Sequence, residues 1–266
     1  FRSRVLKTLD VDSTALGFSG GFPGDFIAQT LEDSNIQSDF VQVDEDTRIN
    51  VKLKSGQETE INAPGPKVTH AQFEQLLSQI RRTTNDDIVI VAGSVPNSIP
   101  SDAYAQIAQI TEKTGAQLVV DAEKDLVETV LPYRPLFIKP NKDELEVMFN
   151  TTVKSDEDVI KYGKEILKKG AQSVIISLGG DGAIYVDQHQ SIKAVNPQGH
   201  VVNTVGSGDS TVAGMVAGLS MGLNVDEAFQ QAVASGTATA FSEDLATRDA
   251  IENIKSQVTI SVLDGE

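Results

Sequence analysis

Strand-like and helix-like segments alternate regularly between residues 68 and 178. Short runs rich in Val and Ile, such as residues 87–92, precede longer segments with apolar residues at helical spacing, such as residues 101–114. Apolar strands without polar alternation are typical of a sheet that is covered on both faces. This order predicts an α/β fold, with a mostly parallel sheet and helices on both of its faces.

The remaining segments extend this pattern at both ends of the chain. A turn cluster is expected at residues 19–24, and two short strands near residue 188 are expected to form an antiparallel pair. The expected helices are 3–9, 25–31, 69–82, 101–114 with Gly115 as C-cap, 124–130, 142–149, 156–169, one beginning near Gly208, 225–240 and 247–256. The expected strands are 14–18, 87–92, 117–120, 136–139, 173–178, 183–186, 191–195 and 258–263.

Polar clusters follow several of the expected strands. In an open α/β sheet, ligands bind beyond the carboxyl ends of the strands. We therefore expect one cleft to collect these clusters. They are Gly93 and Ser94; Asp121; Lys139, Pro140 and Asn141; Ser177 with Gly179, Gly180, Asp181 and Gly182; and Gly206, Ser207, Gly208 and Asp209.

The last of these clusters is a glycine-punctuated loop that leads into a helix of small and apolar residues. Gly206 and Gly208 allow positive φ angles and a close approach of the backbone to a ligand. The first amides of the helix lack partners within it, so with the helix dipole they form an anion site. Asp209 is then either a helix cap or a general base beside a phosphate.

Asn141 and Glu144 lie three residues apart at the start of an expected helix. They form either a capping arrangement or a pair that holds Mg²⁺ through water, which is how this reluctantly dehydrated ion often binds.

Residues 47–53 alternate polar and apolar side chains, and residues 58–62 are expected to return as a second strand. Arg48, Asn50 and Lys52 would share one face of this hairpin. One interpretation is a solvated hairpin with a buried apolar face, made of Ile49, Val51 and Leu53. The other is a lid whose Arg48 and Lys52 hold a substrate phosphate.

The composition and the missing motifs argue against several classes of function. A formal net charge of −16 argues against a nucleic-acid-binding protein, which normally has a basic face. The chain has no cysteine, and its three histidines give little support for a zinc site. Neither a P-loop nor a dinucleotide-binding glycine fingerprint is present. The lack of cysteine, of a signal peptide and of a long apolar run fits a cytoplasmic protein.

Taken together, these motifs resemble the PfkB (ribokinase-like) carbohydrate kinases over nearly the whole chain. Residues 203–209, Asn-Thr-Val-Gly-Ser-Gly-Asp, resemble the C-terminal signature of that family. Residues 139–144 resemble its Asn-x-x-Glu element, and residues 177–182 resemble its ATP-binding turn. Residues 47–52 and 58–66 are most similar to the 1-phosphofructokinase branch.

The resemblance implies a ribokinase-like fold and phosphoryl transfer from ATP to a ketose phosphate, with Mg²⁺. It implies that Asp209 is the catalytic base and that Gly206, Ser207, Gly208 and Asp209 form the anion hole. It further implies roles for three sets of residues. Asn141 and Glu144 would belong to the Mg²⁺–phosphate network; Ser177, Gly179, Gly180, Asp181 and Gly182 would line the nucleotide; and Arg48, Asn50, Lys52 and Ser94 would contact the sugar phosphate.

The branch resemblance favours fructose 1-phosphate as the acceptor, and tagatose-6-phosphate kinase and 6-phosphofructokinase activities remain alternatives. A non-catalytic binder of a sugar phosphate or a nucleotide is an alternative of another class. We expect residues 41–62 to form a small β lid on a kinase core of residues 1–40 and 63–266. The lid either covers its own cleft or pairs with that of a second subunit in a homodimer. Family members also carry a first strand and a Gly-Gly-Lys-Gly-like loop before the helix that residues 3–9 resemble, so we expect further residues upstream of Phe1.

Overall fold

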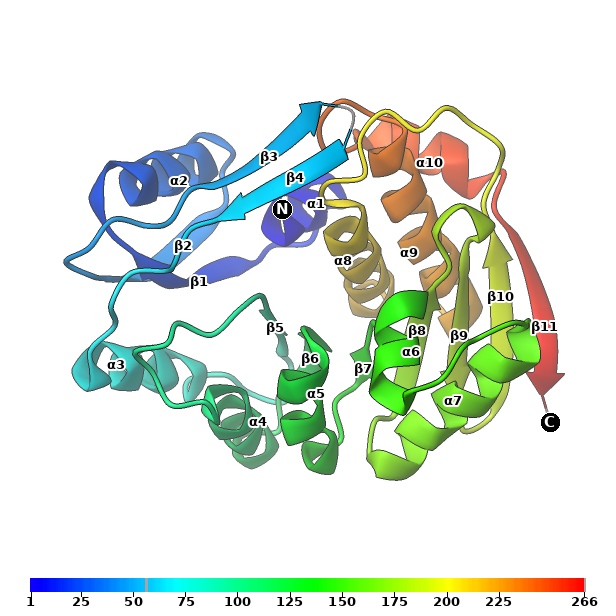
Figure 1. Cartoon of the computed structure of the whole chain (residues 1–266), viewed down its shortest axis with the longest axis horizontal. Coiled ribbons are helices and arrows are strands. Elements are labelled where there is room, and N and C mark those ends of the chain that lie inside the picture. Colours follow the sequence, from blue (N-terminus) through cyan, green and yellow to red (C-terminus); the bar gives the residue numbers. More distant parts are fainter. Residues whose placement is uncertain (56, 266) are drawn as a thin grey trace.

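A seven-stranded sheet forms the centre of the molecule (Figure 1). The computed structural model describes residues 1–55 and 57–265, and the side chains of residues 52–60 lie outside this description. The strand order is β11-β10-β9-β8-β7-β6-β5. Strands β5 to β8 run parallel to one another, and β9, β10 and β11 extend the sheet in antiparallel order. The seven strands are β5 Ile88–Ala92, β6 Gln117–Asp121, β7 Phe137–Ile138, β8 Ser173–Ser177, β9 Ala183–Asp187, β10 Gln190–Val195 and β11 Thr259–Gly265.

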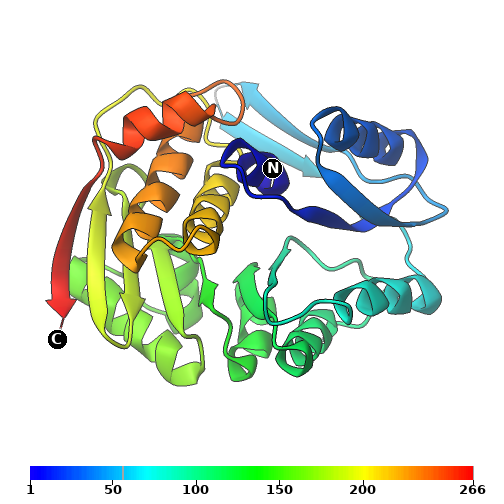
Figure 2. The ribbon, with the colours of Figure 1, turned by 180° about the vertical axis from the view of Figure 1, so that it is seen from behind.

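Helices cover both faces of this sheet, which confirms the predicted α/β architecture (Figure 2). One face carries α1 Arg2–Thr8, α8 Ser207–Ser220, α9 Val225–Ala240 and α10 Arg248–Lys255. The other carries α4 Ala103–Thr114, α5 Lys124–Val130, α6 Lys142–Phe149 and α7 Asp156–Lys169. Among the described residues, no helix combines the length and apolar character needed to cross a membrane.

Side chains of the central strands alternate between two buried clusters. In β6, Val119 packs with the α8 and α9 layer, whereas Leu118 and Val120 pack with the α4 to α7 layer. Successive side chains of a strand point to opposite faces. The two-sided burial explains why these strands read as continuous apolar runs rather than as alternating ones.

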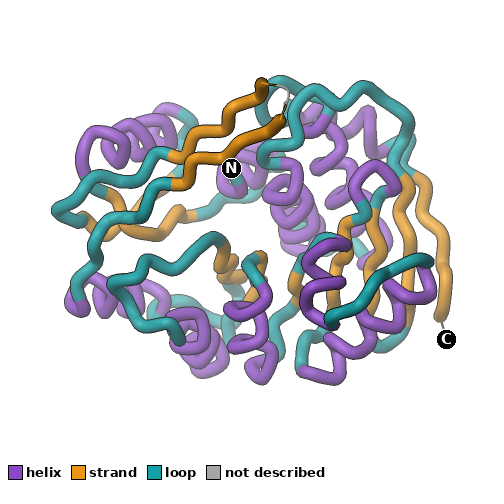
Figure 3. The backbone as a smooth tube through the Cα atoms, viewed as in Figure 1, coloured by secondary structure: helices purple, strands orange, loops and turns teal. Residues whose placement is uncertain are grey.

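A smaller part of the chain stands apart from the main sheet (Figure 3). It contains β1 Thr14–Ser19, α2 Gly21–Asp33 and β2 Gln37–Gln42, and the two strands pair in parallel. The antiparallel hairpin of β3 Asn50–Ser55 and β4 Gln57–Asn62 follows, and α3 His70–Ile80 leads back to the main sheet. In Figure 1 the hairpin lies on the same side of the molecule as α1 and the head of α8.

Two boundaries in this part differ from the predictions. Helix α2 begins at Gly21, so the expected turn cluster is largely helical. A Cβ atom at Gly20 would lie 2.3 Å from the carbonyl oxygen of Glu45, so this glycine permits a close approach between two backbones. Strand β2 was not predicted, since its polar sequence becomes a strand through pairing with β1.

The hairpin itself is confirmed, but its apolar face is not buried. Ile49, Val51 and Ile61 are 55%, 42% and 55% exposed. The interpretation of a buried apolar face is therefore wrong for Ile49 and Val51 in the single chain. The side chain of Leu53, the third predicted member of this face, lies outside the described residues.

Candidate active site

The loop after β10 ends in the head of α8. Gly206 is the N-cap residue and has a φ of +83°, a conformation that L side chains rarely adopt. The amide of Ser207 donates to the carbonyl of Thr204 at 3.1 Å. Within the described residues, the amides of Gly206, Gly208 and Asp209 have no hydrogen-bond partner. These three donors, at the positive end of a 14-residue helix, form a site suited to an anion.

Asp209 lies in the first turn of α8, and its side chain is 24% exposed. The helix has no side-chain cap hydrogen bond, so the alternative of Asp209 as a cap does not describe this structure. One carboxylate oxygen, Oδ1, lies 2.6 Å from Nη2 of Arg2. Within the described part of the chain, the other oxygen, Oδ2, accepts no hydrogen bond and lies farther from Arg2 than Oδ1 does.

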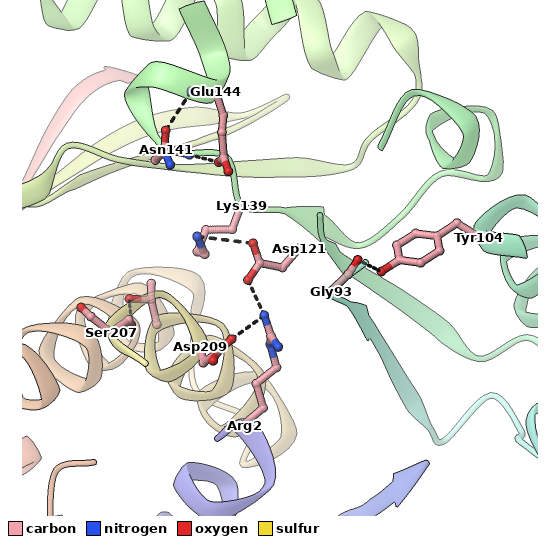
Figure 4. Close-up of polar contacts among 10 residues, drawn as sticks. Arg2, Gly93, Tyr104, Asp121, Lys139, Asn141, Glu144, Ser207 and Asp209 are labelled. Carbon is pink, nitrogen blue, oxygen red and sulfur yellow. Dashed lines mark hydrogen bonds and ion pairs between the residues drawn. The ribbon is translucent and has the colours of Figure 1, made fainter. Parts of the chain in front are cut away.

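A chain of alternating charges connects Asp209 to the end of the sheet (Figure 4). Nη2 of Arg2 also lies 2.5 Å from Oδ2 of Asp121, the last residue of β6. Oδ1 of Asp121 in turn lies 3.4 Å from Nζ of Lys139, just after β7. Four groups of alternating sign thus balance one another, which lowers the cost of placing them in a partly buried site.

Lys139 points from the end of β7 toward the head of α8. Its side chain is only 8% exposed. A Cβ atom built on Gly208 would lie 3.4 Å from Lys139 Nζ, so a side chain at position 208 would crowd the ammonium group. Burial of a lysine is costly unless the charge is compensated, and Asp121 supplies part of that compensation. The cation and the unpaired amides therefore border the same space.

Helix α9 supports the head of α8 from behind. Oγ of Ser207 donates to the carbonyl of Gly236 at 2.8 Å, and the hydroxyls of Ser210 and Thr239 lie 2.9 Å apart. Further along, a Cβ atom on Gly214 would lie 2.9 Å from Cα of Ala232, so the two helices approach at backbone distance. The small residues of both helices therefore fix the position of the α8 head.

Asn141 and Glu144 adopt the capping arrangement at the start of α6. Oδ1 of Asn141 accepts from the Glu144 amide at 2.8 Å, and Oε2 of Glu144 accepts from the Asn141 amide at 2.7 Å. Asn141 also forms a parallel bridge with Ser177, at the end of β8. The cap thus brings the pair beside the expected nucleotide turn.

The donor set of this pair suits a hard cation bound through water. Oε1 of Glu144 has no hydrogen-bond partner among the described residues, and the Asn141 side chain is exposed. Mg²⁺ prefers carboxylate and amide oxygens and keeps much of its water shell. Oε1 of Glu144 therefore fits a water ligand of the ion, whereas capping already uses the single side-chain oxygen of Asn141 and one carboxylate oxygen of Glu144.

The expected nucleotide turn is a short 3₁₀ segment, Gly179–Asp181. Gly182 closes it, because its carbonyl accepts from the Leu178 amide at 2.8 Å. Gly179, Gly180 and Asp181 are exposed, whereas Ser177 is half-buried. A Cβ atom on Gly179 or Gly180 would meet nothing within 4 Å, so the turn presents open backbone toward solvent.

Ser94 follows the end of β5 and is exposed. The preceding Gly93 has a φ of +87°, and its carbonyl accepts a hydrogen bond of 2.7 Å from the hydroxyl of Tyr104 on α4. In Figure 4 the hydroxyl of this tyrosine points toward the Gly93 carbonyl. Burial raises the pKa of the Tyr104 hydroxyl, which therefore remains a donor across the ordinary pH range.

The hairpin residues are not joined to this cluster by any contact within the described residues. Arg48 is exposed, and its Nη1 donates to the Ala63 carbonyl at 3.5 Å. Asn50 is also exposed. The side chain of Lys52 lies outside the described residues.

The structure thus gathers residues from three parts of the chain at one end of the sheet. Asp209 with its neighbouring amides and the Asn141–Glu144 pair all lie there, as the topology predicted (Figure 4). Sequence reasoning assigned no role to Arg2, Lys139 or Tyr104. Only Lys139 carried a signal, because it stands at a strand end immediately before Pro140 and Asn141.

Comparisons with known proteins agree with the family resemblance of the sequence. The pfkB family carbohydrate kinases match residues 2–250. A 1-phosphofructokinase of Bacillus subtilis (strain 168) is 42% identical over 98% of this chain and 86% of its own length. A D-tagatose-1-phosphate kinase of Bacillus licheniformis is 37% identical over 98% of this chain and 86% of its own length.

A solved structure extends the agreement to the fold. A Staphylococcus aureus protein, described as a candidate phosphofructokinase, superimposes with a TM-score of 0.92 at 80% identity. The similarity covers 100% of this chain and 87% of that one. From the family match and from these relatives, the chain belongs to the PfkB family of carbohydrate kinases.

Proposed function

We propose that the chain catalyses the ATP-dependent phosphorylation of fructose 1-phosphate, with fructose 1,6-bisphosphate and ADP as products. The observation that carries this proposal is the placement of Asp209 beside three unpaired amides and the buried cation of Lys139. Transfer of a phosphoryl group to a hydroxyl requires a base that accepts the hydroxyl proton, beside a site that binds the phosphoryl group. The Asp209 carboxylate and the anion site meet these two requirements. The 1-phosphofructokinase among the relatives supports the choice of acceptor.

In the proposed reaction, a hydroxyl oxygen of the sugar phosphate attacks the γ-phosphorus of ATP. The bond from that phosphorus to the bridging oxygen breaks, and its electron pair leaves with ADP. Asp209 takes the hydroxyl proton on Oδ2, the oxygen farther from Arg2. The amides of Gly206, Gly208 and Asp209 and the ammonium of Lys139 meet the negative charge on the equatorial oxygens. Positioning and electrostatics account for most of the acceleration in such transfers.

Bound Mg²⁺ would neutralise part of the phosphate charge. Asn141 and Glu144 would hold this ion through water, with Glu144 Oε1 as the available carboxylate oxygen. Ser177, Gly179, Gly180, Asp181 and Gly182 would line the nucleotide. Arg48, Asn50, Lys52 and Ser94 would contact the sugar phosphate, with the hairpin closing over the acceptor to exclude water.

An ADP-release assay over a panel of ketose phosphates tests the acceptor. Fructose 1-phosphate should give the highest kcat/KM, above fructose 6-phosphate, tagatose 1-phosphate and tagatose 6-phosphate. A higher value with tagatose 6-phosphate or with fructose 6-phosphate would establish one of the alternative kinase activities. The D-tagatose-1-phosphate kinase among the relatives makes the sugar configuration a necessary part of this panel.

A non-catalytic binder on the same fold is the alternative of another class. It predicts ADP or sugar-phosphate binding by calorimetry without any product. Asp209 argues against it, since a binder needs no carboxylate base beside an anion site.

We also propose a homodimer that forms through the hairpin. Ile49, Val51 and Ile61 would lie between the two copies, because these side chains are about half exposed in the single chain. Light scattering on a sizing column should give twice the chain mass for the unaltered protein. Ile61→Lys should shift it to one chain mass, and a single-chain mass for the unaltered protein would exclude this dimer.

A further inference from the structure

Asn196 lies between the expected nucleotide turn and helix α9. It directly follows β10 and is half-buried. Its side-chain Nδ2 donates to the carbonyl of Gly179 at 3.1 Å, and its Oδ1 accepts from Oγ1 of Thr237 at 2.9 Å. Both ends of the amide are therefore engaged, one with each neighbour. Thr237 lies on α9 and is only 6% exposed.

The same turn of α9 also holds the head of α8. Gly236, the residue before Thr237, accepts the hydrogen bond from Ser207 Oγ at 2.8 Å. Gly236 thus contacts the proposed anion hole directly, and Thr237 contacts the nucleotide turn through Asn196. The two residues are consecutive on one buried helix. Because α9 is 16 residues long and buried along most of its length, it is a rigid reference for both.

The nucleotide turn connects β8 to β9, whose pairing holds its two ends, and a Cβ atom on Gly182 would lie 1.9 Å from the carbonyl oxygen of Ala194. The tip of the turn has little other support on the side of α9. Gly179 and Gly180 are exposed and would meet nothing within 4 Å even with a Cβ atom. The bonds within the turn close it but do not fix it relative to α8. The bond from Asn196 to Gly179 is a side-chain connection from the turn toward α9.

We propose that Asn196 and Thr237 are positioning residues that hold the Gly179–Asp181 turn at the correct place for ATP relative to the head of α8. This inference rests on the proposed function, in which that turn lines the nucleotide. ATP must reach from the turn to the anion hole with its phosphates in line. A turn that shifts relative to α8 therefore weakens nucleotide binding without touching the sugar phosphate.

Paired substitutions at Thr237 test the hydroxyl alone. Thr237→Val keeps the shape and removes the donor, and it should raise the KM for ATP roughly three- to tenfold, the effect of one lost hydrogen bond. Thr237→Ser keeps the hydroxyl and should restore a KM within about twofold of the unaltered value. The KM for the sugar phosphate should stay unchanged in both. Thr111→Val is the matched control, because Thr111 is a buried helical threonine that bonds only within α4 among the described residues.

Asn196→Ala removes the other half of the bridge and should act through the same contact. The double variant Asn196→Ala with Thr237→Val should therefore weaken ATP binding less than the product of the two single effects. Multiplicative effects, or an equal rise of both KM values, would overturn the proposal, as would an ATP KM that stays within twofold in both single variants.

ADP affinity from calorimetry separates this inference from the proposed reaction. This affinity measures nucleotide binding at the turn even if every sugar phosphate in the panel proves inactive. Asn196→Ala should weaken ADP binding roughly three- to tenfold with an unchanged thermal midpoint. Unchanged ADP affinity in a folded Asn196→Ala variant would overturn the inference, whether or not the unaltered chain turns over. If Thr237→Val does not fold, this measurement and Thr237→Ser still decide the question.

Discussion

The ammonium group of Lys139 lies 3.4 Å from a carboxylate oxygen of Asp121, and the lysine side chain is almost fully buried. Asp121 ends β6 and Lys139 directly follows β7, the neighbouring parallel strand, so the sheet brings the two residues together. Asp121 stabilises a cation that would otherwise be costly to bury. The ammonium group can then face Gly208 at the head of α8.

Lys139→Met should lower kcat roughly a hundredfold, the scale of removing one preorganised group that stabilises the transition state. The loss should appear in turnover more than in ADP affinity, because ADP lacks the transferred phosphoryl group. Lys142→Met, on the exposed start of α6, is the matched control and should leave kcat unchanged. A folded Lys139→Met variant with normal kcat would remove the lysine from the proposed site.

Asp209→Asn should lower kcat by at least about two orders of magnitude, the scale of losing a general base. The substitution keeps the size of the side chain and removes its capacity to take a proton. ADP affinity by calorimetry should be largely kept, because the backbone amides of the α8 head remain. Near-normal turnover would show that another group accepts the proton.

Tyr104→Phe should raise the KM for the sugar phosphate by roughly two- to tenfold, since it removes the hydrogen bond that fixes the Gly93 carbonyl next to Ser94. The KM for ATP should not change. Tyr185→Phe is the matched control, because Tyr185 is equally buried and its hydroxyl donates to Asp187 over 3.1 Å. This bond does not involve Gly93 or Ser94. Equal kinetic effects of the two substitutions would contradict a specific role for Tyr104.

The local signals in the sequence located many of the helices and strands. Helices α6 and α7 have the predicted bounds, since Asn141 and Ser155 cap them through bonds to residues three positions away. Strand β2 and the first turn of α2 escaped prediction. Both depend on distant segments, β1 and the loop around Glu45, rather than on their own residues.

The candidate site also has a part that the sequence predicts and a part that it does not. The topology of a parallel sheet predicts that polar strand ends meet, which placed Asp209, Asn141 and Ser177 at one end of the sheet. It does not predict which side chains touch there. Tyr104 reaches Gly93 and Asn196 reaches Thr237 through contacts that only the folded chain creates. No spacing rule within the sequence encodes such contacts.

Gly214→Ala should destabilise the protein by about 1–3 kcal/mol, the usual cost of overpacking a close-packed interior. The new methyl group would lie 2.9 Å from Cα of Ala232, and backbone cannot move aside as a side chain can. Gly163→Ala, on α7, is the comparison, because its methyl group would meet the side chain of Val186 at 3.0 Å. Urea unfolding should show the larger loss for Gly214→Ala, and the reverse order would contradict the packing argument.

The ion pair between Arg4 and Asp244 gives a pH-dependent contribution to stability. Nη2 of Arg4 lies 2.7 Å from Oδ2 of Asp244, which ties α1 to the loop after α9. The hydrogen bond from Arg4 lowers the pKa of Asp244 in the folded state, helped by the backbone amide of Leu245. The neighbouring Leu245 packs against the head of α8, since a Cβ atom on Gly206 would lie 2.9 Å from its Cδ2.

Because the folded-state pKa of Asp244 lies below the unfolded value of about 3.9, the contribution of the ion pair to stability is fully present above about pH 4. This contribution is lost as the pH falls through the folded-state pKa. Asp244→Asn should therefore lower the thermal midpoint slightly at pH 7, and the difference between variant and unaltered chain should close as the pH falls below the unfolded pKa of about 3.9 and through the lower folded pKa. The effect should be small and weaker at high salt, because the Asp244 side chain is 66% exposed. A midpoint difference that persists even when the pH is lowered far enough to protonate Asp244 in the folded chain would show that the substitution acts through packing, not through the charge.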